Sequence, residues 1–207
     1  MQSRRPMTES QNEDCQHAIP ASLWEGDFGV LARRLGLSPD DPENRIPDRA
    51  LIEQLYRDGQ EALARRVTAV NEQVAERTGG KKLAPYALIS DSVWNGPEGD
   101  VLLALGFSPY DDWNIALLPT DYATARLLDL PIHPRREVDG FVELARSILG
   151  REIAGLRDAH SRAARDHDFA AYRAHRERVC ERVRELAARI HDEMHALTKR
   201  HLKAQSA

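Results

Sequence analysis

The histidines near the C-terminal end of the chain are the residues best suited to metal chemistry. His191 and His195 are four residues apart, and His201 follows six residues later. Residues four apart lie on the same face of a helix, so the first two imidazoles can chelate one zinc ion. Measured from Ile190 in the apolar seam, however, they lie about 100° and 140° round the helix, toward solvent. We therefore expect an exposed helix face, and His191 with His195 as a metal site is the alternative.

The spacing of His191, His195 and His201 is similar to that of the three zinc ligands of the metzincin peptidases. Two residues depart from that family's pattern: its glutamate after the first histidine is Asp192 here, and its helix-breaking glycine before the third is Thr198. In an unbroken helix, six residues turn the chain by about 600°, so the third histidine would point away from the second. These departures favour the exposed-face interpretation.

A second candidate site lies in the middle of the chain, where Asp, Trp and Asn occur together twice. The stretch 91–95 reads Asp-Ser-Val-Trp-Asn, and 111–114 reads Asp-Asp-Trp-Asn. Such residues at loop ends can line a polar ligand pocket. Turn formation and core packing explain the same residues equally well. The predicted ligand-binding residues are Asp91, Trp94, Asn95, Asp111, Trp113, Asn114 and His133.

The third set is basic. Residues 146–207 contain fourteen Lys or Arg against nine Asp or Glu, which leaves the first 145 residues with a net charge of −9. This asymmetry predicts either an acidic or nucleic-acid partner or a contact between the two halves. Glutamates interleave at i,i+4 spacing, as on an ordinary solvated helix. The candidate contact residues are Arg173, Arg176, Arg182, Arg184, Arg189, Lys199, Arg200 and Lys203.

Two long amphipathic helices are expected to carry these basic residues. From Val179 onward the apolar residues of the last helix recur at steps of three and four, nearly the spacing of a coiled-coil seam. A comparable stripe runs from Val138 to Ala163, and residues 166–168 are a plausible joint, with Asp168 as an N-cap. The two stripes predict a helical hairpin that pairs with itself, with the rest of the chain, or with a second copy.

The N-terminal third reads as a tail followed by helices. Residues 1–20 lack periodicity and are expected to be disordered, and 22–35 predict a short helix. Residues 31–38 resemble the first helix and turn of bacterial helix-turn-helix domains. The prolines and carboxylates of 39–43 argue against a DNA-reading helix after them. A long helix is predicted from 47 to the glycines at 79–80, with Gly59 marking a close helix crossing.

The segment 83–118 is richer in turns. Its apolar runs at 83–94, 101–107 and 113–118 fit a small antiparallel meander, and they also fit two short helices; we favour at least one hairpin. Residues 121–130 predict a helix. The expected fold class is mainly α (α+β): a helical bundle with a long C-terminal hairpin and a small irregular or β-hairpin segment. The expected divisions are 1–20, 21–134 and 135–207.

Composition excludes several classes of protein. No apolar run approaches the length of a membrane span, no secretory signal follows the N-terminus, and the two cysteines form no disulfide framework. We therefore expect a cytoplasmic protein. The arginine-rich composition hints at a bacterial source. No phosphate loop, catalytic triad or cofactor motif is present, so no cofactor is expected and catalysis is disfavoured. The favoured function is a non-catalytic interaction or regulatory protein that self-associates, as a dimer, through its C-terminal helices. The alternatives are a nucleic-acid-associated protein, and an enzyme or ligand-binding protein with its site between Asp91 and His133.

Overall fold

The computed structural model describes residues 49–166 and 169–205. The predicted tail at 1–20, the helix at 22–35, the stretch at 31–38 and the joint residue Asp168 lie outside them. The described elements follow the order helix, strand, two short helices, strand and short helix, and then two long helices.

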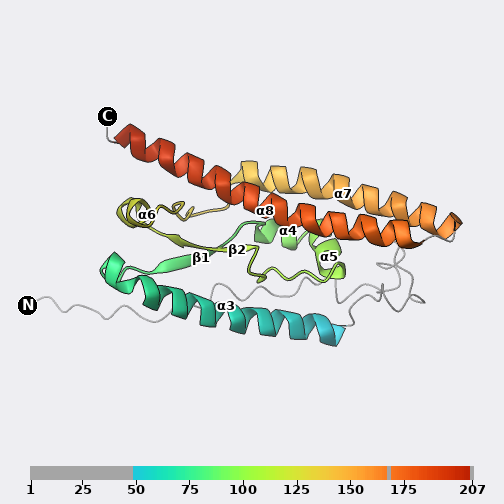
Figure 1. Cartoon of the computed structure of the whole chain (residues 1–207), viewed down its shortest axis with the longest axis horizontal. Helices are drawn as coiled ribbons and strands as arrows, with labels where there is room; N and C mark the ends of the chain where they lie inside the picture. Colours follow the sequence, from blue (N-terminus) through green and yellow to red (C-terminus); the bar gives the residue numbers. More distant parts are fainter. Residues whose placement is uncertain (1–48, 167–168, 206–207) are drawn as a thin grey trace, which may run out of the picture.

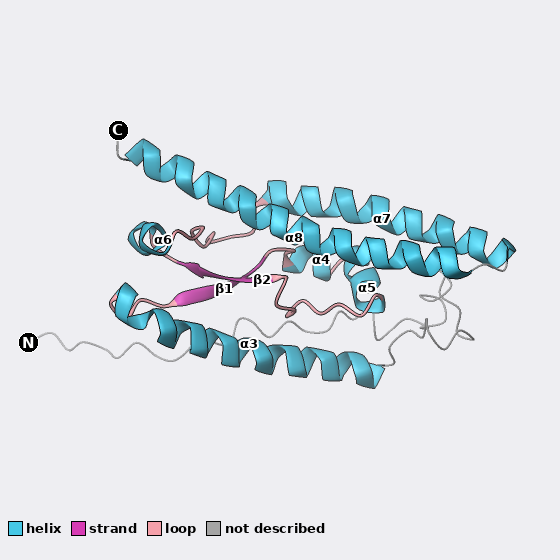
Figure 2. Cartoon of the chain, viewed as in Figure 1, coloured by secondary structure: helices cyan, strands magenta, loops and turns pink. Residues whose placement is uncertain are grey.

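Helices enclose a small sheet from two sides (Figures 1 and 2). α3 (Arg49–Thr78) covers one side of the sheet, and α7 (Asp139–Asp166) and α8 (Phe169–Gln205) form an antiparallel pair on the other. α4 (Asp91–Trp94) and α5 (Pro97–Ala104) pack against α7, and α6 (Tyr122–Leu128) follows the second strand. This arrangement confirms the predicted fold class.

Within the described residues, the sheet has two antiparallel strands. β1 (Leu83–Ala87) pairs with β2 (Ile115–Pro119) in a register that places Leu83 opposite Pro119 and Ala87 opposite Ile115. The first and third apolar runs therefore pair with each other, whereas the predicted meander would pair each of them with the middle run. The middle run forms α5 instead, so the meander interpretation is wrong there. Pro97 stands at the start of α5, and the run that follows has few β-branched residues, both of which favour a helix.

One edge of this sheet is closed by a side chain. The backbone N–H of Leu83 donates to Asn71 Oδ1 at 2.6 Å, and Asn71 Nδ2 donates to the Leu83 carbonyl at 3.1 Å. Farther along β1, Pro85 has no backbone N–H to leave open. The α3 residue thus occupies the hydrogen-bonding position of a neighbouring strand.

α3 packs its apolar seam on the sheet. Val67, Val70 and Val74 are half-buried and contact a cluster formed by Leu83, Ile115 and Leu117. The helix ends as predicted, because Gly79 and Gly80 adopt φ values of +63° and +79°, where other residues are strained.

Gly59 does make a close approach, but its partner is a loop, so the predicted helix crossing at this position is wrong. A Cβ at this position would lie 2.9 Å from Tyr110 Cβ and 3.2 Å from Ser108 Oγ. The missing side chain therefore lets the loop after α5 touch α3.

The seam of α8 is covered within the chain as far as Met194. Its members Val179, Val183, Leu186, Ile190 and Met194 are each at most 4% exposed. They share a core cluster with α7 and with the middle segment, and each such side chain contributes roughly 1.5–3 kcal/mol on burial. The next seam residue, Leu197, is 46% exposed.

Among the described residues, no helix is long and apolar enough to cross a bilayer. The boundary expected at residue 134 stays a prediction.

Candidate ligand-binding pocket

A pocket of about 250 Å³ opens where six segments of the chain meet. α3 contributes Leu63, β1 contributes residues 85–87, and the start of α4 contributes Ser90 and Asp91. The loop before β2 adds Pro109 and Tyr110, β2 adds Ile115, and the loop before α7 adds residues 133–137. Two of the sequence-predicted ligand residues, Asp91 and His133, therefore line one cavity.

His133 is held in place by both strands. Its backbone N–H donates to the Pro119 carbonyl at 2.8 Å, and its Nε2 lies 3.2 Å from the Pro85 carbonyl oxygen. The ring also packs edge-to-face on Tyr86, with centroids 5.4 Å apart. A neutral imidazole that donates from Nε2 to Pro85 keeps Nδ1 as an acceptor.

Two tyrosines give the pocket hydroxyl groups on aromatic walls. The Tyr110 hydroxyl accepts from Gln60 Nε2 at 2.9 Å, and its ring packs edge-to-face on Tyr56. Burial, together with the smaller effect of the carboxylates of Glu137 and Asp91, raises the pKa of Tyr86 to about 12. Tyr86 is therefore protonated at neutral pH and sits in a region of negative potential.

The acidic side of the mouth is fixed by hydrogen bonds to α4. Glu137 Oε1 accepts from the backbone N–H of Ser92 at 3.1 Å, and Arg146 donates to the Ser92 carbonyl at 3.0 Å. The first contact attaches the loop before α7 to the start of α4, and the second attaches α7 itself. The exposed residues Arg135 and Arg136 precede Glu137 in the same loop.

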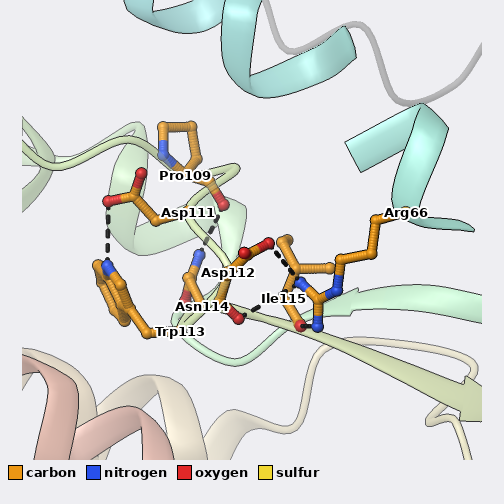
Figure 3. Close-up of polar contacts among 7 residues, drawn as sticks. All are labelled: Arg66, Pro109, Asp111, Asp112, Trp113, Asn114 and Ile115. Carbon is orange, nitrogen blue, oxygen red and sulfur yellow. Dashed lines mark hydrogen bonds and ion pairs between the residues drawn. The ribbon is translucent and has the colours of Figure 1, made fainter. Parts of the chain in front are cut away.

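The Asp-Trp-Asn stretch at 111–114 builds a turn beside the pocket (Figure 3). Asn114 is fully buried; its Nδ2 donates to the Pro109 carbonyl at 2.9 Å, and its Oδ1 accepts from Ile89 N–H at 2.7 Å. Asp111 Oδ2 accepts from Trp113 Nε1 at 3.0 Å. These side chains hold the backbone, as the turn interpretation predicts.

The neighbouring residue Asp112 ties the same turn to α3. Arg66 donates to Asp112 Oδ1 at 2.9 Å and to the Ile115 carbonyl at 3.0 Å. In the first stretch, Trp94 is 2% exposed and fills the core, and Asn95 is exposed outside the pocket.

Sequence reasoning missed Tyr86, Tyr110 and Glu137 as pocket residues. Tyr86 lies within an apolar strand, and Tyr110 lies in a stretch that reads as a turn. Neither they nor Glu137 belong to any motif, so only the packing of the six segments brings them together.

The predicted metal residues lie on α8 away from this pocket. His195 Nε2 is 3.2 Å from Asp129 Oδ1, and Lys199 Nζ is 3.3 Å from the same oxygen. Hydrogen bonds from Lys199 and His195 hold the pKa of Asp129 below its ordinary value. The contact fixes the end of α6 to α8. In the described part of the chain, no three His, Cys, Asp or Glu residues gather as metal ligands.

Several of the predicted basic contact residues have partners inside the chain. Arg182 donates to Glu152 Oε1 at 2.6 Å, Arg184 lies over the Phe107 ring at 5.4 Å from its centroid, and Lys199 pairs with Asp129. Arg173 and Arg176 also have interactions within the chain. Arg189 lines a groove between α7 and α8, and Arg200 and Lys203 are exposed.

The chain matches no protein-family model, no curated protein and no solved structure.

Proposed function

We propose that the protein binds a small organic ligand in the pocket between β1, α4 and the loop before α7. The observation that carries the proposal is the convergence of Tyr86, His133 and Asp91 on one apolar cavity. Ligand sites are typically concave, largely apolar and equipped with a few oriented polar groups. Apolar contact would come from Leu63 and Ile115.

Preformed geometry supports the same proposal. His133, Glu137 and Tyr110 each have a hydrogen-bond partner in the chain, so their positions are set before a ligand arrives. Preorganised groups give up less conformational entropy on binding than mobile ones. Among the described residues that line the pocket, no nucleophile is paired with a base, so binding is better supported than catalysis.

Saturation-transfer NMR with a library of amphipathic fragments tests this function. Fragments should contact the native protein and lose that contact in Ala87→Phe, which adds a ring inside the pocket. Ala84→Phe is the matched control, because Ala84 lies on the same strand but does not line the pocket. Thermal melting of both variants shows whether they fold. Equal fragment contact in both folded variants would refute the proposal.

Self-association through the C-terminal helices is the second candidate function. It is supported by Leu197, which continues the α8 seam beyond the part that is covered and is 46% exposed. An apolar residue in that position is suited to contact with a second helix. Sedimentation velocity over a range of protein concentrations tests this candidate. A dimer that persists in high salt and dissociates in Leu197→Glu supports it, and a monomer at all concentrations rejects it.

A further inference from the structure

The mouth of the pocket carries two groups of opposite charge. Asp91 and Glu137 provide two carboxylates, and Arg135 and Arg136 provide two guanidinium groups. The lining is therefore neutral overall when His133 is neutral. A ligand with a net charge would be matched on one side and opposed on the other.

The carboxylates act together at Tyr86. Both add to the effect of burial on the pKa of the Tyr86 hydroxyl, which places their negative potential at the aromatic wall. A protonated amine would gain from two carboxylates and from the face of an aromatic ring. Glu137 remains able to accept because its hydrogen bond from Ser92 involves Oε1.

The guanidinium groups are available to a ligand. Neither Arg135 nor Arg136 has a hydrogen bond or an ion pair with any residue of the ranges 49–166 and 169–205. Guanidinium groups bind carboxylates through paired N–H donors. An anionic group at the arginine side of the mouth would therefore complete contacts that the chain itself does not make.

An apolar wall lies behind both charged groups. Leu63, Pro85, Ala87 and Ile115 come from the three elements that enclose the cavity, and the rings of Tyr86 and Tyr110 add aromatic surface. These surfaces suit an apolar side chain attached to the charged part of a ligand.

We infer that the ligand is a zwitterion with an apolar side chain, of the chemical class of the apolar α-amino acids. Its ammonium group faces Asp91 and Glu137, its carboxylate faces Arg135 and Arg136, and its side chain rests on Leu63 and Ile115. This inference rests on the proposed function and specifies the chemistry of the same pocket.

Isothermal titration calorimetry with three compounds that share one side chain tests the inference. L-phenylalanine carries both charges, phenethylamine carries only the amine, and 3-phenylpropanoate carries only the acid. L-phenylalanine should bind at least about tenfold more tightly than either analogue, because each lost charge-assisted contact is worth about 1.5 kcal/mol or more. An analogue that binds as tightly as L-phenylalanine overturns the inference.

Failure of the ligand class and failure of the function give different results. If none of the three compounds binds while fragments still contact the native pocket, the zwitterion class is wrong and the binding function stands. If fragments also fail to contact the pocket, the proposed function fails with it.

Charge-neutral variants assign each group. Glu137→Gln keeps an acceptor for Ser92 N–H and should weaken the preference for L-phenylalanine over 3-phenylpropanoate, because only the Asp91 carboxylate then remains to face the ammonium group. Arg135→Gln with Arg136→Gln should abolish its preference over phenethylamine. Arg126→Gln removes an exposed charge on α6 outside the pocket and should change neither preference. Unchanged preferences in the pocket variants would refute the assignment.

Discussion

Replacement of Gly59 by alanine tests the contact that places Tyr110 against α3. A glycine inside an exposed helix normally costs stability, so alanine stabilises such a helix by about 1 kcal/mol. At Gly59 the added Cβ would lie 2.9 Å from Tyr110 Cβ, an atom bonded directly to the backbone. Side-chain rotation cannot move that atom, so the loop must shift.

The expected magnitude follows from the two opposing effects. Overpacking of this kind costs about 1–3 kcal/mol, which exceeds or offsets the gain of about 1 kcal/mol in helix propensity. We expect Gly59→Ala to lower the free energy of unfolding by about 1 kcal/mol. Gly150→Ala is the matched control, because Gly150 is exposed in α7 and its added Cβ would meet nothing within 4 Å.

Urea unfolding followed by circular dichroism measures both variants. Gly150→Ala should raise the free energy of unfolding by about 1 kcal/mol, so the two variants should differ by about 1–3 kcal/mol. In thermal melting each kcal/mol corresponds to about 2–4 °C for a chain of this size. Equal stabilisation by both substitutions would show that the loop does not approach α3 as described.

Three further predictions concern the turn, the histidines and the basic helix. Asn114→Ala should lower the free energy of unfolding by about 2–4 kcal/mol, because it leaves Ile89 N–H and the Pro109 carbonyl buried without partners. A loss below about 0.5 kcal/mol in urea unfolding would show that these two hydrogen bonds do not stabilise the turn. Burial lowers the pKa of His160 and is the largest of the effects that lower the pKa of His175. The unfolded chain therefore binds more protons than the folded chain below about pH 6.5, so the free energy of unfolding should fall as the pH falls through that range. Replacing either histidine by glutamine should reduce the slope of the free energy of unfolding against pH. An unchanged slope would contradict the reasoning. Because several α8 cations have partners inside the chain, a labelled random duplex should show no salt-dependent anisotropy change between about 50 and 200 mM salt; micromolar binding that Arg189→Glu abolishes would contradict this prediction and support the nucleic-acid hypothesis.

Periodicity predicted the long helices because one face of each is continuously apolar. The seam from Val179 to Met194 and the glycine stop after Thr78 are local patterns, and both appear in the structure as expected. The secondary structure of the middle segment is harder to predict, since a short apolar run fits a strand or a helix equally well. The pairing of Leu83 with Pro119 depends on residues 36 positions apart and has no local signal.

The candidate pocket was predictable only in part for the same reason. Asp91 and His133 are polar residues near predicted loops, and they do line one cavity. The Asp-Trp-Asn stretches fit two interpretations because turn formation and ligand binding use the same side chains. At Asn114 the side chain serves turn formation, because its amide is hydrogen-bonded to backbone groups. Tyr86 and Glu137 acquire their significance only through tertiary packing.

The contact of Asn71 with Leu83 bears on solubility. A sheet of two strands has an edge for each strand, and an open edge is a template on which other chains can pair and aggregate. A side-chain amide has the same donor and acceptor groups as a peptide bond, so Asn71 imitates one residue of a third strand. With Pro85 farther along, β1 offers an incoming chain little to pair with. The protein can therefore keep a very small sheet without the risk of edge-to-edge polymerisation along β1.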